Sequence, residues 1–188
     1  DSRRENVLRA AECGPDILDL PMANTPDVVR EFVANGKYAP VGNRGLFGAS
    51  PAMRYGIGET IAEGQRRIND ELCLMAQIET REAAENAEGI CSVPGLDAVF
   101  LGPGDMSASF GVPGDTKNPL VIDALVRTIG AARQQGLLSA MMTPIDEVEF
   151  WVEQGVELLF VTSDVLCMKT AAKSFLDTAV GSSRRGQG

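Results

Sequence analysis

The sequence predicts a parallel α/β protein whose strand spacing suits a TIM-type (β/α) barrel. Short apolar runs begin near residues 17, 72, 98, 137 and 158, and each is followed by a segment with helical character. This alternation is typical of parallel sheets in which helices connect the strands. Eight strands close such a barrel, and this chain supplies about five.

The first strand is expected at Ile17 to Leu20, between two helices. Residues Ser2 to Glu12 place apolar side chains on one helical face, which predicts the helix before the strand. After the strand, Thr25-Pro26 supplies an N-cap and a first-turn proline. A second helix is therefore expected to run to about Ala34.

Residues 35–58 form a long connection that is rich in Gly, Pro and Asn and lacks clear periodicity. A connection of this length indicates a functional loop. Arg44 lies in it, and two roles are open for its side chain: orienting an anionic substrate, or bracing a contact between subunits. An arginine in a surface loop is also common without either role. A helix from Gly58 to Ile68 is expected next.

Two neighbouring strands are each followed by a carboxylate. The segments Leu72 to Ile78 and Ala98 to Leu101 are nearly continuous apolar runs, and Thr80 to Ala87 between them has helical character. A right-handed βαβ crossover brings the carboxyl ends of both strands to the same edge of a sheet. We therefore expect Glu79 and Asp105 to lie side by side at the edge where ligands bind in α/β proteins.

Two converging carboxylates suit a hard divalent cation such as Mg²⁺ or Mn²⁺. Gly102, Pro103 and Gly104 precede Asp105; glycines let the backbone approach a ligand, and free N–H groups at a helix start attract an anion. The alternative is that Glu79 ends a strand by chance and Asp105 is only an N-cap. Spacing alone does not choose between the two.

The last third of the chain continues the alternation. Thr143-Pro144 repeats the signal of an N-cap and a first-turn proline. The expected elements are a helix from Pro119 to Gln135, a strand from Leu137 to Met142, a helix ending before Gly155, a strand from Leu158 to Thr162, and a helix from Ser163-Asp164 to about Leu176. We expect one domain over residues 1–181 and a disordered tail over 182–188.

Composition excludes several classes of function. The chain has 188 residues, of which 44% are hydrophobic, and a net charge of −9 without a basic stripe. These properties predict one globular domain with no nucleic-acid partner. No apolar run is long enough for a membrane span, so we expect a cytoplasmic protein without a membrane partner. The chain contains no His, which excludes a Ser-His-Asp triad or a His-rich zinc site within it.

Two segments resemble the signature of a known enzyme family. QIETREAAEN (77–86) and GLDAVFLGPGDMSASFG (95–111) are similar to motifs of the HpcH/HpaI aldolase family, the divalent-metal-dependent class II pyruvate aldolases. The resemblance implies that Glu79 and Asp105 ligate Mg²⁺ or Mn²⁺ and that Gln77 lies near the bound oxo acid. It also implies that the backbone of Gly102 to Asp105 receives the carboxylate of pyruvate.

The resemblance extends over most of the chain. VGNRG, which contains Arg44, matches a family GxRG segment. Met142 occupies the place of a hydrophobic residue over the pyruvate methyl, although methionines in apolar runs usually belong to the core.

By this resemblance the chain is an aldehyde-lyase, a carbon-carbon lyase. It would cleave or form a 4-hydroxy-2-oxo acid or a 2-keto-3-deoxy sugar acid, with pyruvate and an aldehyde as products or substrates, through a metal-stabilised enolate. The family also implies a homo-oligomer, commonly a hexamer. Two alternatives stay open: a lyase of CoA thioesters like citrate lyase β, and a catalytically inactive binding or scaffold subunit, which the lack of His favours.

The resemblance also places the start of this chain after the third strand of the family. The His on family strand two, the Asp that pairs with it, and the Arg on strand three have no counterpart here. Three explanations are open: the sequence is a fragment of a longer protein, the missing part comes from another chain, or the strands rearrange. We favour the first.

Overall fold

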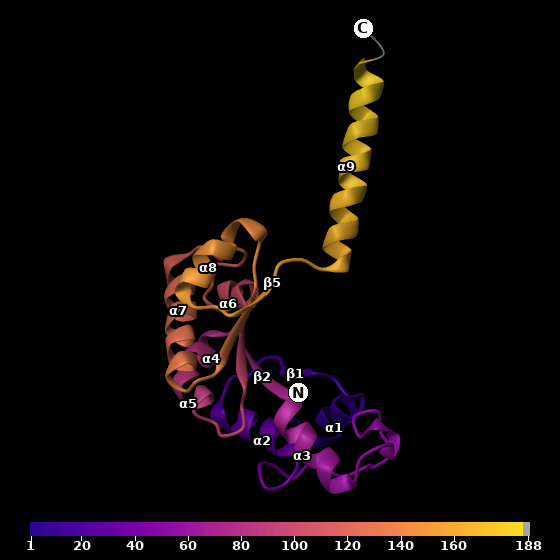
Figure 1. Ribbon diagram of the computed structural model, residues 1–188. Helices are drawn as coiled ribbons and strands as arrows, with labels where there is room; N and C mark the ends of the chain where they lie inside the picture. Colours follow the sequence, from indigo (N-terminus) through magenta and orange to yellow (C-terminus); the bar gives the residue numbers. More distant parts are fainter. Residues whose placement is uncertain (186–188) are drawn as a thin grey trace.

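The strands form one parallel sheet in chain order (Figure 1). The computed structural model describes residues 1–185, and the side chains of residues 1–180. The sheet order is β1-β2-β3-β4-β5, and every neighbouring pair is parallel. The strands are β1 (Ile17–Leu20), β2 (Cys73–Ile78), β3 (Ala98–Leu101), β4 (Leu138–Met142) and β5 (Leu158–Phe160). This sequential order is that of neighbouring barrel strands, without the order reversal of a doubly wound sheet.

Helices follow the strands as the pattern predicts. The side chain of Thr25 accepts a hydrogen bond from the Val28 N–H at the start of α2, and Thr60 and Glu63 form a capping box at the start of α3. The helices are α1 (Arg4–Glu12), α2 (Pro26–Gly36), α3 (Ile61–Glu71), α4 (Arg81–Glu85), α5 (Ala87–Cys91), α6 (Pro103–Ser109), α7 (Pro119–Gln134), α8 (Val148–Gln154) and α9 (Asp164–Arg185), with 3₁₀ turns η1 (Arg54–Gly56) and η2 (Ile145–Glu147).

Several boundaries differ from the prediction. The single helix expected over Thr80 to Ala87 is two short helices, α4 and α5, which meet at Asn86. Thr143-Pro144 does not cap α8, because η2 intervenes and the N-cap of α8 is Glu147. Helix α9 continues to Arg185 and therefore includes residues 182–185 of the expected tail. Residues 186–188 lie outside the described part of the chain.

The two faces of the sheet have different surroundings. Leu20, Leu74 and Val99 point toward the helices and join the main hydrophobic core with α2, α5 and α7. The opposite face carries a smaller cluster of Met75, Ala98 and Ala140, with Cys73 and Phe100 packed against it. On this second face Ile17, Met142 and Phe160 are 38%, 43% and 40% exposed. Within the described chain this face is therefore open to solvent.

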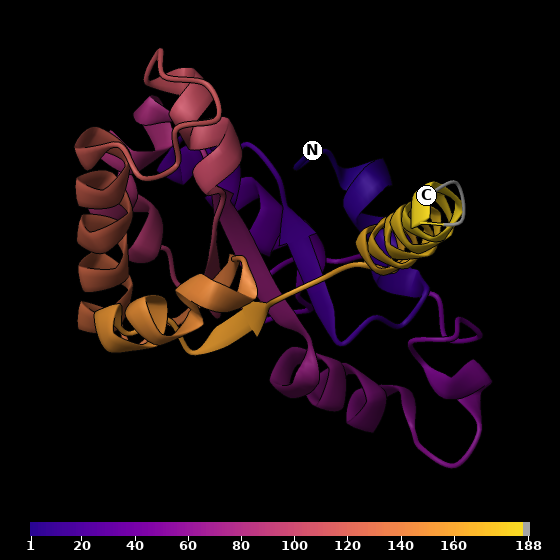
Figure 2. The ribbon, with the colours of Figure 1, turned by 90° about the horizontal axis from the view of Figure 1, so that it is seen from above.

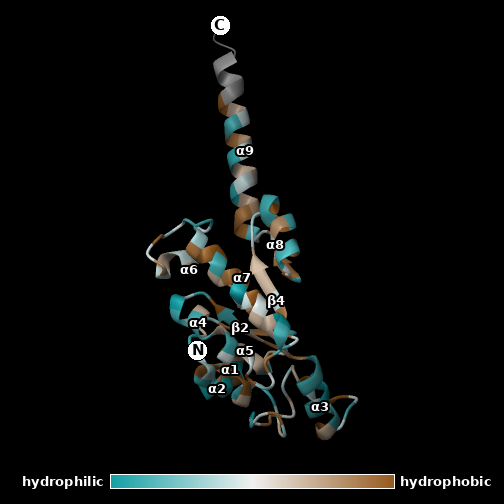
Figure 3. Ribbon diagram, turned by 90° about the vertical axis from the view of Figure 1, so that its left-hand side faces the viewer, coloured by the Kyte–Doolittle hydropathy of each residue, from teal (hydrophilic) through white to brown (hydrophobic). Residues whose placement is uncertain are grey.

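Helix α9 extends away from the rest of the molecule (Figure 1). Figure 2 shows α7 and α8 on one side of the sheet and α9 on the other. Apolar residues recur along α9 (Figure 3), and the exposed ones include Val165, Leu166, Met168, Phe175 and Leu176, each between 45% and 74% exposed. Among residues 1–185, no helix has the length and apolar character needed to cross a membrane.

Candidate active site

Glu79 and Asp105 follow neighbouring strands at the carboxyl edge of the sheet. Strands β2 and β3 pair as far as Ile78 and Leu101, and the Gly102 N–H continues the ladder by donating to the Ile78 carbonyl at 3.1 Å. Glu79 comes directly after β2, and Asp105 lies in the first turn of α6. The structure thus places both carboxylates at the carboxyl edge of the sheet, Glu79 at the end of β2 and Asp105 in the helix that follows β3.

The Glu79 carboxylate is buried, with 4% of the residue exposed. Its Oε1 accepts a hydrogen bond from the Met22 N–H at 2.9 Å, and its Oε2 accepts one from Gln77 Nε2 at 2.6 Å. No Lys or Arg of the described side chains forms an ion pair with it. An ionised buried carboxylate is costly without a compensating positive charge. The surroundings of Glu79 therefore suit a cation.

Gly102 holds the two strand ends close together. A Cβ at this position would lie 2.6 Å from Glu79 Cβ and 3.1 Å from Glu79 Oε2, so only glycine fits without displacing the carboxylate. Gly102 is also the N-cap of α6, and Pro103 occupies the first turn.

Asp105 is consequently inside α6, and the alternative that it serves only as an N-cap is wrong. Its side chain is exposed. Among the described residues it forms no ion pair. Asp105 is therefore available to bind a ligand beside Glu79.

A pocket of about 670 Å³ lies on the open face of the sheet at this edge. Phe100 and Phe160 contact each other edge to face in its lining, with ring centroids 5.6 Å apart. The pocket brings together Gln77, Met142 and the turn from Gly102 to Asp105, which the sequence indicated. Glu79 does not line it, but its carboxylate accepts a hydrogen bond from the lining residue Gln77. Its lining consists of Asp19, Met75, Gln77, Phe100, Gly102, Pro103, Gly104, Asp105, Met142, Phe160, Thr162 and Ser163.

Asp19 is a pocket residue that the sequence pattern did not single out. The pKa of Asp19 is raised from its ordinary value of 3.8 to about 6. Desolvation is the largest cause, repulsion from Glu79 adds to it, and a hydrogen bond from the Leu20 backbone partly offsets both. The signal in the sequence was a lone acid inside the apolar run Ile17 to Leu20. A charged side chain in a strand otherwise made of apolar residues marks a polar patch on one face.

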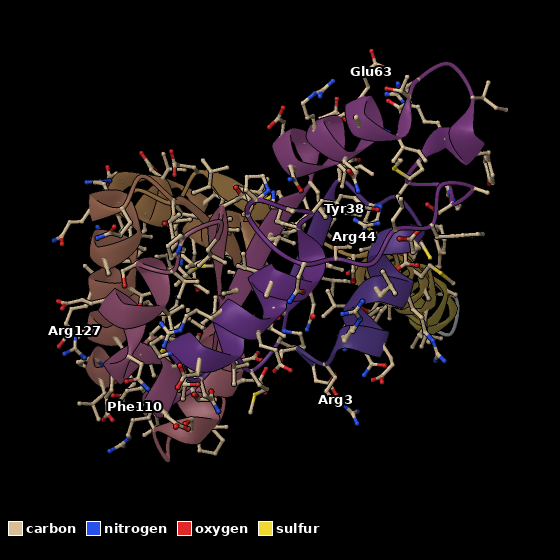
Figure 4. All side chains as sticks on the ribbon, turned by 90° about the horizontal axis from the view of Figure 1, so that it is seen from below. Arg3, Tyr38, Arg44, Glu63, Phe110 and Arg127 are labelled. Atoms are coloured by element: carbon tan, nitrogen blue, oxygen red, sulfur yellow. The ribbon has the colours of Figure 1, made fainter. Side chains whose placement is uncertain are left out.

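Arg44 is not brought to this pocket. Its Nη2 donates to Glu12 Oε1 at 3.1 Å, and its guanidinium lies 4.8 Å from the ring centroid of Tyr38 (Figure 4). The side chain is fully buried. Arg44 borders a separate cavity of about 220 Å³, together with Asp16 and Leu72, which precede β1 and β2. It therefore braces its loop against α1 at the opposite end of the strands, and the substrate contact considered from the sequence is not made at the described pocket.

The donor set for a metal is small. The described residues contain no group of three or more His, Cys, Asp or Glu side chains placed to hold an ion. Two carboxylates are sufficient for Mg²⁺, which usually keeps several waters and takes further oxygens from its substrate. The residues present fit that kind of site.

Family comparison covers most of the chain. The family described as HpcH/HpaI aldolase/citrate lyase matches residues 2–171. This chain belongs to the HpcH/HpaI aldolase/citrate lyase family. The fold class predicted from the sequence is confirmed by solved structures of the same family.

Two crystal structures of HpcH/HpaI proteins are closely similar to this chain. The HpcH/HpaI aldolase of Desulfitobacterium hafniense DCB-2 superposes with a TM-score of 0.87 at 31% identity, covering 94% of this chain and 68% of that one. An HpcH/HpaI aldolase/citrate lyase family protein of Burkholderia cenocepacia J2315 gives a TM-score of 0.86 at 27% identity, covering 95% and 70%.

Curated HpcH/HpaI relatives are named as aldolases. The hydroxypyruvate/pyruvate aldolase of Sagittula stellata is 36% identical over 167 residues, which are 88% of this chain and 65% of the relative. The 2-keto-3-deoxy-L-rhamnonate aldolase of Klebsiella pneumoniae is 36% identical over 171 residues, covering 86% and 63%. The chain therefore spans slightly less than two thirds of the length of these relatives.

Proposed function

We propose that this chain carries the metal-binding and keto-acid-binding edge of a class II pyruvate aldolase. The reaction breaks or forms the C3–C4 bond of a 4-hydroxy-2-oxo acid, with pyruvate and an aldehyde on the other side. The observation that carries the proposal is the buried Glu79 carboxylate at the end of β2, which has no cationic partner among the described side chains, with Asp105 in the first turn of the helix that follows the neighbouring strand β3. The relatives named as aldolases support the same reaction class.

Glu79 and Asp105 would hold Mg²⁺ or Mn²⁺, with water and the substrate supplying the other oxygens. When bound, the cation polarises the 2-oxo group and offsets the negative charge that develops there during cleavage. The Met22 N–H and the Gln77 amide fix the orientation of the Glu79 carboxylate for this role. Met22 holds its N–H there with φ at 55°, a left-handed conformation that is uncommon for residues other than glycine.

The remaining pocket residues would bind and orient the keto acid. The backbone of Gly102 to Asp105 receives its carboxylate, and Gln77 lies beside its oxo group. Met142, with Phe100 and Phe160 on the same pocket wall, packs against the methyl side and excludes water.

In the cleavage direction, the C4 hydroxyl loses its proton and the C3–C4 electron pair moves onto the pyruvate unit. A proton is then added at C3, so that pyruvate and the aldehyde are released. By the family resemblance the proton acceptor is a His that has no counterpart in this chain. The Glu79 and Asp105 edge would therefore supply binding and charge compensation, and a His base would lie outside the 188 residues of this chain, which contain no His.

We infer in addition that the protein forms a homo-oligomer, in which the exposed apolar side chains of α9 are covered. A hexamer is the assembly that the resemblance implies. We also place the protein in the cytoplasm, which agrees with the lack of a membrane-spanning helix among residues 1–185.

The test is pyruvate release from a 4-hydroxy-2-oxo acid by the full-length protein, coupled to lactate dehydrogenase. We expect EDTA to abolish activity, Mg²⁺ or Mn²⁺ to restore it, and Glu79→Gln to lower kcat/KM by a factor of roughly 100 or more, the range seen when a single charge-stabilising group is removed. Glu82→Gln is the matched control, because Glu82 is exposed on α4 and does not line the pocket.

Activity that survives both EDTA and Glu79→Gln would refute the metal role. Cleavage of CoA thioesters with no turnover of free acids would favour the citrate lyase type of reaction. An absence of turnover on either substrate would favour the binding or scaffold role.

A further inference from the structure

The pocket lining together with Glu79, which is hydrogen-bonded to the lining residue Gln77, carries three carboxylates, one more than a divalent cation compensates. The lining contains two acidic side chains, Asp19 and Asp105, and no Lys or Arg among the described residues. A divalent cation at the proposed site would compensate the charges of Glu79 and Asp105. Asp19 would then remain as a single negative charge facing the ligand.

Strand geometry directs Asp19 into the pocket. Side chains alternate along β1, so Leu18 and Leu20 pack into the main core, whereas Ile17 and Asp19 lie on the open face. Asp19 is opposite Met75 of β2 in the parallel register, and Met75 also lines the pocket. Asp19 therefore belongs to the β1 side of the pocket, away from the β5 side.

The two sides of the pocket differ in chemistry. On the β1–β2 side the lining has Asp19, Met75 and Gln77, so Asp19 is the acidic side chain there. On the strands of the β3–β5 side the lining is apolar, with Phe100, Met142 and Phe160, and the polar residues Asp105, Thr162 and Ser163 lie beyond the strand ends. Asp19 forms no ion pair with the described side chains. Its carboxylate oxygens are consequently available to accept hydrogen bonds from a ligand and to repel a ligand that carries an acid group.

We propose that Asp19 is a specificity-determining residue that disfavours aldehydes carrying a carboxylate and favours aldehydes carrying a hydroxyl group. The inference rests on the proposed aldolase function and names the substrate class of that same site. Asp19 lies close to the proposed metal site, because it lines the same pocket as Gln77 and Asp105. At pH 7.5, above a pKa of about 6, Asp19 is mostly ionised and repels anions.

The experiment compares aldol addition of pyruvate to three aldehydes by the full-length protein with Mn²⁺ at pH 7.5: succinic semialdehyde, glycolaldehyde and propionaldehyde. We expect Asp19→Asn to raise kcat/KM for succinic semialdehyde by roughly tenfold, because one like charge is removed from a partly desolvated site. Asp19→Leu should do the same and also lower kcat/KM for glycolaldehyde by roughly tenfold, because a charged hydrogen-bond acceptor is lost. The kcat/KM for propionaldehyde, which has neither a carboxylate nor a hydroxyl group, should change little in Asp19→Asn.

Asp16→Asn is the matched control, because it removes the same charge from the residue before β1, beside the cavity at the opposite end of the strands. Asp16→Asn should leave the ratios of kcat/KM among the three aldehydes unchanged. The inference is overturned if the ratio of kcat/KM for succinic semialdehyde to kcat/KM for glycolaldehyde in Asp19→Asn stays within twofold of its value in the unsubstituted protein. It is also overturned if Asp16→Asn shifts this ratio equally.

Deuterium exchange at the pyruvate methyl, followed by NMR in D₂O without any aldehyde, separates this inference from the proposed function. Exchange in both the unsubstituted protein and Asp19→Asn, with no change in aldehyde ratio, refutes the role of Asp19 and leaves the aldolase function standing. No exchange in the unsubstituted protein refutes the aldolase function itself. Exchange that is lost only in Asp19→Asn assigns Asp19 to pyruvate chemistry and contradicts a role confined to the aldehyde.

Discussion

At the scale of single residues, the site depends on carboxylates that are held in different surroundings. Glu79 is buried and takes hydrogen bonds from Met22 and Gln77, so its position is fixed before any ligand arrives. Asp105 is exposed on the first turn of α6. In the proposed metal site, a fixed carboxylate and an accessible one would allow an ion to enter and still meet a preformed ligand.

Asp19 gives a prediction about stability. Its folded-state pKa is raised from 3.8 to about 6, so the folded state disfavours the ionised form and loses stability as the pH rises through 6. Asp19→Asn should therefore raise the free energy of unfolding at pH 7.5 by about 1 kcal/mol. This value is lower than the full pKa shift implies, because part of the Asp19 side chain is in contact with solvent, which screens its charge. The gain should shrink as the pH falls below 6 and vanish near pH 4.

Urea unfolding in EDTA at pH 7.5, 6 and 4 measures this difference, with Asp16→Asn as the control for a simple change of net charge. A gain in the free energy of unfolding that is the same at all three pH values would show that the ionised Asp19 carboxylate does not destabilise the folded state.

Sequence reasoning reached some of these residues and missed others for physical reasons. Glu79 and Asp105 follow the ends of two parallel strands, and the parallel topology alone places both ends at the same edge of the sheet. Asp19 was missed because its strand reads as an apolar run, and a run of that kind does not reveal that one face of the sheet lines a pocket. The position of Arg44 depends on contacts with Glu12 and Tyr38, which no local pattern encodes.

At the scale of elements, the turn between β3 and α6 determines whether the two carboxylates can share a ligand. The backbone at Gly102 approaches Glu79 so closely that a Cβ would lie 2.6 Å from that of Glu79. This close contact packs the end of β2 against the start of α6. The same turn ends strand β3 and begins the helix that carries Asp105.

Gly102→Ala should therefore disturb both stability and metal binding. We expect a loss of about 1–3 kcal/mol in the free energy of unfolding, as for other overpacked sites, and a fall in Mn²⁺ affinity of at least roughly tenfold, because the Glu79 carboxylate is displaced. Chemical denaturation and Mn²⁺ titration followed by electron paramagnetic resonance measure the two effects.

Gly130→Ala is the matched control for this change. Gly130 lies inside α7, and nothing is within 4 Å of the Cβ that alanine would add. Helix propensity then favours alanine, so stability should be retained or raised and Mn²⁺ affinity should not change. Equal changes in stability and Mn²⁺ affinity in Gly102→Ala and Gly130→Ala would contradict the claim that the close approach of Gly102 to Glu79 requires glycine.

Local signals predicted the elements better than their boundaries. Thr25-Pro26 starts α2 as expected, because the cap and the proline act within one turn. Thr143-Pro144 has the same pattern but leads into η2, and the Thr143 hydroxyl is buried with no hydrogen-bond partner among the described residues. The packing of the following segment, and not the local pair, decides where α8 begins.

At the scale of the whole molecule, the described chain is an open part of a (β/α) barrel. Strands β1 and β5 are the edges of the sheet, and the face that bears the pocket is exposed at Ile17, Met142 and Phe160. Exposed edges and apolar faces are normally paired or covered.

The central claim is that Glu79 and Asp105 share one divalent ion. Crystals of the full-length protein grown with Mn²⁺ and pyruvate, with anomalous diffraction to locate the metal, test it most directly. The account predicts one Mn²⁺ coordinated by both carboxylates, with pyruvate oxygens completing its coordination beside Gly102 to Asp105. A metal bound elsewhere, or bound to only one of the two side chains, would contradict it.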